Sequence, residues 1–428
     1  MAGATWLAGV GCVEITPQKP VQMAGYYGDR VSTRTHDPLF AQALALSDGK
    51  TVVAMTEVDV VSVAAELVAE IREMAQKLCG VPGGRIMIAA THTHTGPHLE
   101  REPEYLAWMK PRVAEAVAAA VKDLAASELR FGRTEQREVS FIRRFRMKDG
   151  SVVTNPGLLN PNVAHPLGVV DPQLNTLRVV RNGKTRAVVV NFALHCDTVG
   201  GDHISACWPY FMAERMKEEL GTDVEVIFTQ GCAGDINHWN VFKGGHFKGF
   251  EEAKRIGRIV GEGALRALAA EETVAPGPVA AAQRVVALPI QPVSEEDYKA
   301  AKAEMARPYT STADFTMERV LARKRVRAYE WPDKVWKLET QTLRAGSVAF
   351  VGVPGELFNA LGRQIKAGSP LRHTSVVELA NNGSGYIGEA FNYAEGGYEM
   401  TSSVVAPGSG EMVRDAALEA LREVAGVK

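Results

Sequence analysis

Residues 86–98 read Ile-Met-Ile-Ala-Ala-Thr-His-Thr-His-Thr-Gly-Pro-His. The apolar residues at the start predict a buried strand, and Gly96-Pro97 closes the Thr/His segment that follows. His92 and His94 are two residues apart, so their side chains would share a face if the strand continued through them. Because neutral imidazole is the commonest protein ligand of transition metals, this stretch predicts half of a metal site. For the two histidines alone, a polar loop that merely ends a strand is an equally good interpretation.

A β–α–β unit leads into this stretch. Apolar residues at helical spacing predict a helix over 61–80, and a strand at 52–55 precedes it. This order of elements implies that the two strands flanking the helix pair in parallel. The strand at 52–55 also forms a predicted hairpin with 41–46 across Asp48-Gly49. In α/β enzymes, reactive groups lie at such strand ends and in the loops that follow them.

Two further apolar strands end near possible metal ligands. Residues 187–194 predict the second strand of a hairpin, and this strand ends at His195. The run 349–353 predicts another buried strand, with Glu356 just beyond it. Two histidines and a carboxylate, with one position left open, are the usual ligands of a catalytic zinc ion. His92, His195 and Glu356 therefore predict a zinc site, and chance spacing is the alternative.

The rest of the chain alternates between strands and helices. Further helices are predicted at 103–127, 209–220, 250–271, 317–329 and 411–424. We therefore expect a mixed α/β fold, layered α/β/α, with mixed and partly parallel β-sheets. Residues 1–428 are expected to form a single domain, and the Pro/Gly-rich segment 275–278 is the best candidate for a boundary within it.

Composition and charge narrow the function classes. Of 428 residues, 46% are hydrophobic and 23% charged, and the formal net charge is -2, which argues against nucleic acid as a partner. The basic run 323–327 is interpreted as a solvated helix face. No apolar run approaches the ~20 residues of a membrane span, and no leader is recognisable, so we expect a cytoplasmic protein. The five cysteines form no CxxC pair, and nothing in the sequence indicates an oligomeric state.

Seven segments, in the same order along the chain, resemble motifs of the neutral/alkaline (non-lysosomal) ceramidase family. Residues 91–97 stand where the family has Thr-His-Thr-His-Ser-Gly-Pro, and residues 354–357 where it has Pro-Gly-Glu-Phe. Residues 230–237 are similar to its Gln-x-x-x-Gly-Asp-Val-Ser-Pro-Asn segment. The other similar segments are 9–17, 142–144, 195–198, and Gly385-Tyr386 taken with Tyr398-Glu399. No single motif is enough to establish the resemblance, but seven motifs in the same order are hard to obtain by chance.

The resemblance implies the fold of the neutral ceramidase catalytic domain and one zinc ion per chain. The zinc ligands that it implies are His92, His195, Glu356 and Tyr386. The catalytic and substrate-contacting residues that it implies are His94, Arg143 and Tyr398. Asn237 stands where the family has Ser, and its amide could still donate a hydrogen bond to a substrate.

The implied reaction is hydrolysis of an N-acyl amide by zinc-activated water. His94 would donate to the oxyanion or protonate the leaving amine, and Arg143 and Tyr398 would bind the oxyanion or a polar group of the substrate. The expected substrate is a small-molecule or lipid amide. Ceramide itself does not follow, because the chain resembles shorter bacterial relatives that lack the family's C-terminal domain. Two alternatives stay open: a zinc esterase or lactonase, and a non-catalytic relative that binds a metal or ligand.

Overall fold

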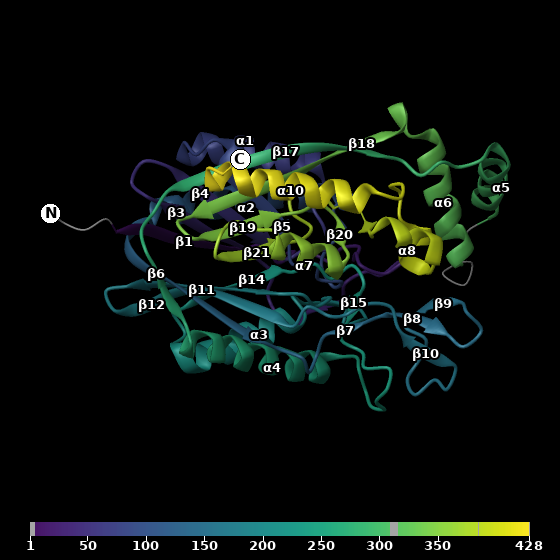
Figure 1. Cartoon of the computed structure of the whole chain (residues 1–428), viewed down its shortest axis with the longest axis horizontal. Coiled ribbons are helices and arrows are strands. Elements are labelled where there is room, and N and C mark those ends of the chain that lie inside the picture. The colour runs from purple at the N-terminus through teal and green to yellow at the C-terminus, as the bar shows by residue number, and fades with distance from the viewer. Residues whose placement is uncertain (1–4, 309–315, 384, 428) are drawn as a thin grey trace.

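The computed structural model describes residues 5–308, 316–383 and 385–427. Two β-sheets lie face to face, and helices cover their outer faces (Figure 1). The larger sheet has nine strands: β1 (Trp6–Glu14), β3 (Phe40–Ser47), β4 (Val52–Val58), β5 (Ile86–Ala90), β6 (Ala125–Glu135), β11 (Gln173–Arg181), β12 (Lys184–Phe192), β14 (Glu225–Gln230) and β16 (Glu272–Val274). The smaller sheet has four: β17 (Val279–Pro289), β18 (Val335–Ala345), β19 (Val348–Gly352) and β21 (His373–Val377).

The described α-helices are α1 (Ala65–Cys79), α2 (Pro103–Lys122), α3 (Trp208–Leu220), α4 (Phe250–Ala269), α5 (Glu295–Ala306), α6 (Met317–Glu330), α7 (Asn359–Ala367), α8 (Ala390–Glu395), α9 (Tyr398–Ser402) and α10 (Ser409–Ala425). The remaining short elements are β2 (Arg34–Thr35), β7 (Phe141–Ile142), β8 (Arg144–Met147), β9 (Val152–Thr154), β10 (Val163–Pro166), β13 (His203–Ile204), β15 (Ile236–Asn237), β20 (Glu356–Leu357), β22 (Tyr386–Ile387), η1 (Gly83–Arg85) and η3 (Pro332–Lys334). No described helix combines the length and the apolar character needed to cross a membrane.

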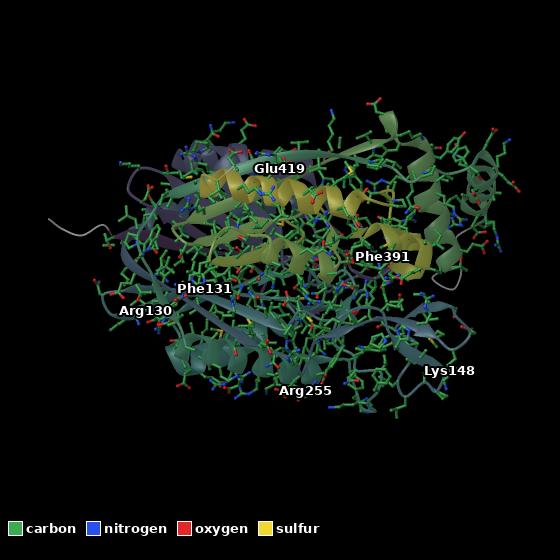
Figure 2. The ribbon with its side chains drawn as sticks, in the orientation of Figure 1. Arg130, Phe131, Lys148, Arg255, Phe391 and Glu419 are labelled. Atoms are coloured by element: carbon green, nitrogen blue, oxygen red, sulfur yellow. The ribbon has the colours of Figure 1, made fainter. Side chains whose placement is uncertain are left out.

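The layers follow from residues buried on both faces of the larger sheet. In β5, Ile86 and Ile88 pack with α1 and α2, whereas Met87 and Ala89 face the smaller sheet. Helices α3 and α4 cover the other part of the same outer face, and α7 and α10 cover the smaller sheet. The order of layers is therefore helices, sheet, sheet, helices. Figure 2 shows the alternation in β6, where Phe131 lies inside and its neighbour Arg130 at the edge of the molecule.

The mixed α/β class with partly parallel sheets is confirmed, although the sheet layer is double. Strands β4 and β5 pair in parallel around α1, as the β–α–β pattern predicts, and so do β12 with β14 and β19 with β21. Both predicted hairpins form, β3 with β4 and β11 with β12. Helix α1 ends at Cys79 and is capped by Gly80, whose φ of 75° suits glycine.

The helices differ from the sequence-based predictions in two respects. The helix expected over 103–127 ends at Lys122, because Ala125 and Ala126 pair with β1 as the start of β6. Their helical propensity is overridden by this tertiary pairing. Helices α5, α7, α8 and α9 were not expected from the sequence. The first turn of α5 is capped by Ser294, whose hydroxyl accepts from the Asp297 N–H.

The segment 275–278 crosses from one sheet to the other. It connects β16, which pairs with β6, to β17 at the edge of the smaller sheet. One hydrophobic cluster contains side chains of both sheets, including Trp6, Leu343 and Phe350. Because the two sheets share this core, we propose that the chain 1–428 is one folding unit in spite of this crossing.

The larger sheet curls so that its edges meet. Its strands run in the order β14-β12-β11-β6-β1-β3-β4-β5, and the two end strands β14 and β5 nevertheless contact each other. The Gln42 amide of β3 donates to the Val226 carbonyl of β14 at 3.1 Å. The curl brings the loops after β5 and β12 together, although these strands lie far apart in the hydrogen-bonded order.

Candidate metal centre

His92 does not lie on the strand that precedes it. Strand β5 ends at Ala90, and His92 has a φ of 67°, so the idea that His92 and His94 share a strand face is wrong. This left-handed backbone is uncommon for histidine. It is supported here by the His92 N–H, which donates to the Val60 carbonyl at 3.1 Å. The ring is fixed as well, because Nδ1 donates to the Val61 carbonyl at 2.7 Å.

Three imidazole rings nevertheless meet at one point. The His92 Nε2 lies 3.1 Å from the His195 Nε2 and 3.2 Å from the His94 Nε2. His195, like His92, uses Nδ1 to donate to a backbone carbonyl, that of Ala233 at 3.2 Å. With the proton on Nδ1, both rings direct the lone pair of Nε2 inward. Two lone pairs at this distance repel each other unless a proton or a cation lies between them.

Glu356 brings a carboxylate to the same point. Its Oε2 lies 3.5 Å from the His92 Nε2 and 3.6 Å from the His195 Nε2. This oxygen is buried, and no described residue forms a hydrogen bond to it. Strand β20 pairs in parallel with β22, which sets Glu356 beside Tyr386. The close packing requires glycine at position 234, where a Cβ would lie 2.3 Å from the Glu356 carbonyl oxygen.

The donor set fits a zinc-sized cation. A tetrahedral zinc ion with bonds of about 2.0–2.1 Å holds its ligand atoms about 3.3 Å apart. The separations here run from 3.1 Å between the His92 and His195 Nε2 atoms to 3.6 Å between His195 and the Glu356 Oε2. His92, His94 and His195 also form a group whose ligand atoms all lie within 4.8 Å of one another. These three histidines could hold a metal ion.

Electrostatics favour a positive charge among these donors. Burial lowers the pKa of His94 to about 4 and that of His195 well below its usual value, so both rings are neutral. Although burial opposes it, His92 and the charge of Arg143 help to lower the pKa of Glu356 to about 2. Glu356 in turn raises the pKa of His92 against the effect of burial. The negative charge of Glu356 therefore favours a proton on His92. A cation bound among these side chains would balance the same charge in place of that proton.

Arg143 points its guanidinium toward the histidines. Its Nη1 lies 3.5 Å from the His195 Nε2, and its carbon Cζ lies 5.0 Å from the centre of the Tyr386 ring. Its Nε donates to Glu399 at 2.7 Å and its Nη2 to the Gly234 carbonyl at 2.8 Å. Although burial opposes its charge, Tyr386 and Glu399 hold the pKa of Arg143 well above its usual value. The buried guanidinium therefore stays charged.

The neighbouring Arg144 shares Glu399 with Arg143, its Nε lying 3.6 Å from the Glu399 Oε2, but its other partners differ. Its Nη1 lies 3.3 Å from Glu395, and its Nη2 donates to the Gly396 carbonyl at 2.8 Å. Of the two adjacent arginines, Arg143 is the one within reach of the histidines.

The two predicted tyrosines lie side by side. The Tyr386 and Tyr398 ring centres are 5.5 Å apart, and the Tyr398 hydroxyl hydrogen-bonds the Tyr27 hydroxyl. Burial and the charge of Glu356 raise the pKa of Tyr386 well above its usual value. A cation close to this phenol would have the opposite effect. Tyr27 was not singled out from the sequence.

Two carboxylates at the site were missed by the sequence reasoning. Glu399 is fully buried and accepts from Arg143 and from the Thr154 hydroxyl, the latter at 2.7 Å. Asp197 lies 3.2 Å from the His238 Nδ1; although burial opposes it, His238 lowers the pKa of Asp197 well below its usual value. Glu399 directly follows Tyr398, and Asp197 lies two residues after His195, so both stand inside segments that resemble family motifs.

Asn237 already uses both ends of its amide. Its Nδ2 donates to the Asn155 Oδ1 at 3.1 Å, and its Oδ1 accepts from the His238 N–H at 2.6 Å. The side chain therefore ties the loop at Asn155 to β15. Its role in substrate binding stays a prediction.

Two solved structures are similar to this chain over nearly its whole length. Neutral ceramidase from Pseudomonas aeruginosa superimposes with a TM-score of 0.78 over 99% of this chain and 75% of the ceramidase chain, at 19% identity. The chain has the neutral ceramidase fold. A ceramidase complexed with C2 gives a TM-score of 0.77 over 99% and 76% of the two chains, at 18% identity. The likeness confirms the expected fold. No protein-family model matches the chain, and no curated protein matches it in sequence.

Proposed function

We propose that this protein is a zinc-dependent hydrolase that cleaves the carboxamide bond of an N-acyl amide. The observation that carries the proposal is the buried carboxylate oxygen of Glu356, which lies within 3.6 Å of two inward-facing imidazole nitrogens and accepts no hydrogen bond from any residue that the structure describes. The neutral ceramidase fold supports the amide class, because ceramide, on which a ceramidase acts, is an N-acyl amide.

One ion per chain would be held by His92, His195 and Glu356, with Tyr386 as the fourth ligand. His94 lies close enough to the same point to be a further ligand or to act beside the ion. When bound, zinc acts as a Lewis acid toward a carbonyl oxygen and lowers the pKa of a water molecule to about 7.

The chain's own residues supply the remaining functions. Arg143, held by Glu399 and Gly234, can donate hydrogen bonds to the carbonyl oxygen as it becomes negative. The His94 ring is neutral, so it can accept the proton that the attacking water loses and pass that proton to the departing nitrogen. The Tyr398 hydroxyl, next to that of Tyr27, can bind a polar group of the substrate. Asn237 would bind a substrate only if its amide gave up the hydrogen bond to Asn155 and donated to the substrate instead.

Zinc content and amide hydrolysis, measured together, test the proposal. The wild-type chain is expected to bind about one zinc ion and to release the amine from N-octanoylethanolamine. His92→Ala should lose both, with a fall in kcat of about 1,000-fold or more, because the ligand is also needed for chemistry. His165→Ala removes an exposed histidine of β10 and serves as the matched control. Equal turnover by wild type and His92→Ala would contradict the proposal.

His94→Ala separates the two roles of that histidine. If His94 acts beside the ion, the variant keeps zinc and loses turnover. If His94 is a ligand, zinc and turnover fall together, as in His92→Ala.

A further inference from the structure

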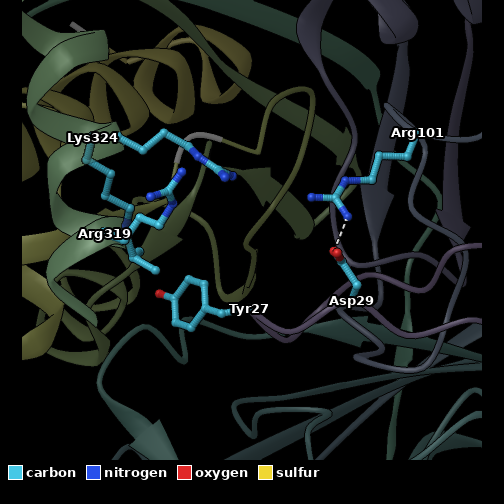
Figure 3. Close-up of a pocket in the computed structure, with 7 residues that line it drawn as sticks. Tyr27, Asp29, Arg101, Arg319 and Lys324 are labelled. Atoms are coloured by element: carbon cyan, nitrogen blue, oxygen red, sulfur yellow. Dashed lines mark hydrogen bonds and ion pairs between the residues drawn. The ribbon is translucent and has the colours of Figure 1, made fainter. Parts of the chain in front are cut away.

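A cavity of about 440 Å³ lies beside the candidate metal centre. Figure 3 shows Arg319 and Lys324 of α6 on one side of this cavity and Arg101 with Asp29 on the other. The complete lining is Tyr27, Asp29, Arg101, Arg319, Val320, Arg323 and Lys324. We call it the basic cavity.

The lining carries an excess of positive charge. Four of its side chains are cationic and one, Asp29, is anionic. Asp29 is bound to Arg101, whose Nη1 lies 2.5 Å from its Oδ1. Lys324 donates to the Ser402 carbonyl at 2.8 Å, which is a neutral acceptor. Among the described residues, no carboxylate forms an ion pair with Arg323 or Lys324, so this wall keeps uncompensated charge although the whole chain has a net charge of -2.

Tyr27 connects the basic cavity to the metal centre. It lines the cavity, and its hydroxyl bonds that of Tyr398, whose ring packs against Tyr386. The interaction between the charges of Lys324 in the cavity and Glu356 at the metal centre agrees with the two sites being neighbours. Burial lowers the pKa of Lys324 to about 8, and the charge of Glu356 opposes that shift. A substrate at the metal centre therefore has a cationic recess next to it.

We propose that the substrate bears an anionic group, a carboxylate or a phosphate, that binds in the basic cavity while its amide lies at the metal centre. The inference rests on the proposed amide hydrolysis and narrows its substrate class to acidic N-acyl amides, which sets it apart from uncharged ceramide. A recess with uncompensated cations on its α6 wall, and with the Asp29-paired Arg101 on the opposite wall, suits a compact anion better than a flat polyanionic surface. Arg323 and Lys324 thus have a role beyond that of a solvated helix face.

Four amides that share an eight-carbon chain test the inference. N-octanoylglycine carries a carboxylate on its amine part, N-octylsuccinamate carries one on its acyl part, and N-octanoylphosphoethanolamine carries a phosphate. N-octanoylethanolamine is the uncharged reference. For each compound, kcat/KM and, by calorimetric titration, Kd are measured with the zinc-loaded wild type. At least one charged compound should be preferred about tenfold or more over the reference, and the preferred compound identifies the anion and its position.

Variants of α6 show whether the preference comes from the basic cavity. Arg323→Glu reverses an exposed cation of the wall and should weaken binding of the preferred compound about tenfold, while the uncharged reference changes by less than about twofold. Arg325→Glu makes the same change two residues away, at an exposed residue outside the lining, and should alter neither compound. Arg101→Gln removes a cation from the opposite wall and should act in the same direction as Arg323→Glu.

The two proposals fail in different ways. If the amides are hydrolysed but no charged compound is preferred, or if Arg325→Glu acts as strongly as Arg323→Glu, the anion site is wrong and the hydrolase stands. If no amide is hydrolysed, the hydrolase is wrong, and Kd decides the site: tighter binding of an anion that is lost in Arg323→Glu supports it, and equal Kd values overturn it.

Discussion

The candidate metal centre and the basic cavity lie next to each other but are built in opposite ways. At the metal centre, His92 and His195 are buried and each ring is fixed by a bond to a backbone carbonyl. In the basic cavity, the Arg323 side chain is exposed, and its guanidinium lies at the end of a long, flexible chain. Buried charges interact in a low dielectric and resist screening, whereas exposed ones are screened by salt. Losing one group should therefore abolish function at the first site and only weaken it at the second.

The largest effect is expected for Glu356→Gln. The amide keeps the size of the side chain but removes the charge that balances a cation. Zinc affinity should fall about 100-fold or more, because loss of an outer partner of a metal ligand alone costs about 10–100-fold. A zinc titration against a competing chelator measures this. Binding of the preferred anionic amide in the basic cavity should change by less than about threefold; a parallel loss of both would show that the two regions are one site.

Glu399→Gln is expected to have the next largest effect. Glu399 holds Arg143, and a hydrogen bond between charged groups contributes about 1.5–3 kcal/mol. We expect kcat to fall about 10–100-fold with zinc content unchanged and KM changed little, since Arg143 would act mainly on the developing negative charge.

Glu395→Gln is the control for Glu399→Gln, because Glu395 contacts Arg144 and Arg146 but is not a partner of Arg143. It should leave kcat within about twofold. If Glu399→Gln raised KM and left kcat unchanged, Glu399 would not be positioning Arg143 for catalysis. Thermal unfolding of both variants shows whether either change merely unfolds the chain.

The salt dependence of KM should also distinguish the two regions, with a smaller effect than the substitutions. Raising NaCl from about 50 to about 500 mM shortens the screening length severalfold and should raise KM for the anionic amide about three- to tenfold. KM for N-octanoylethanolamine and the zinc content should stay the same. A similar rise in KM for both amides would place the salt effect outside the basic cavity.

The smallest effect is a pH dependence of anion binding. Burial and, less strongly, Arg327 lower the pKa of Lys324 to about 8, while Glu356 opposes the shift. The amine is charged below that pH and neutral above it, so affinity for the anion should decrease as pH rises through about 8. Between about pH 7 and about pH 9 we expect a loss of about twofold to fivefold. Lys324→Met should remove this step, and a step that persists in the variant belongs to another group.

The pattern of apolar and polar residues within a segment predicted a residue's role where that role depends on the same segment. The apolar runs that end near His92, His195 and Glu356 form strands, and all three side chains meet at one point. Glu399 was missed because its role depends on Arg143, which is 256 residues away in the chain. A buried ion pair of this kind leaves no periodic signal in either segment.

The sequence by itself determined the hairpins, the β–α–β unit and the polar residues at the strand ends, because these depend on short-range spacing of apolar and turn-forming residues. Only the tertiary structure decided that β5 and β14, at opposite ends of the strand order, come into contact. It also decided that His92 adopts a left-handed backbone, and that α6 places its cations beside Tyr27. The physical reason is that sheet curl and the packing of one layer on another sum many small twists and contacts, none of which is encoded in a single segment.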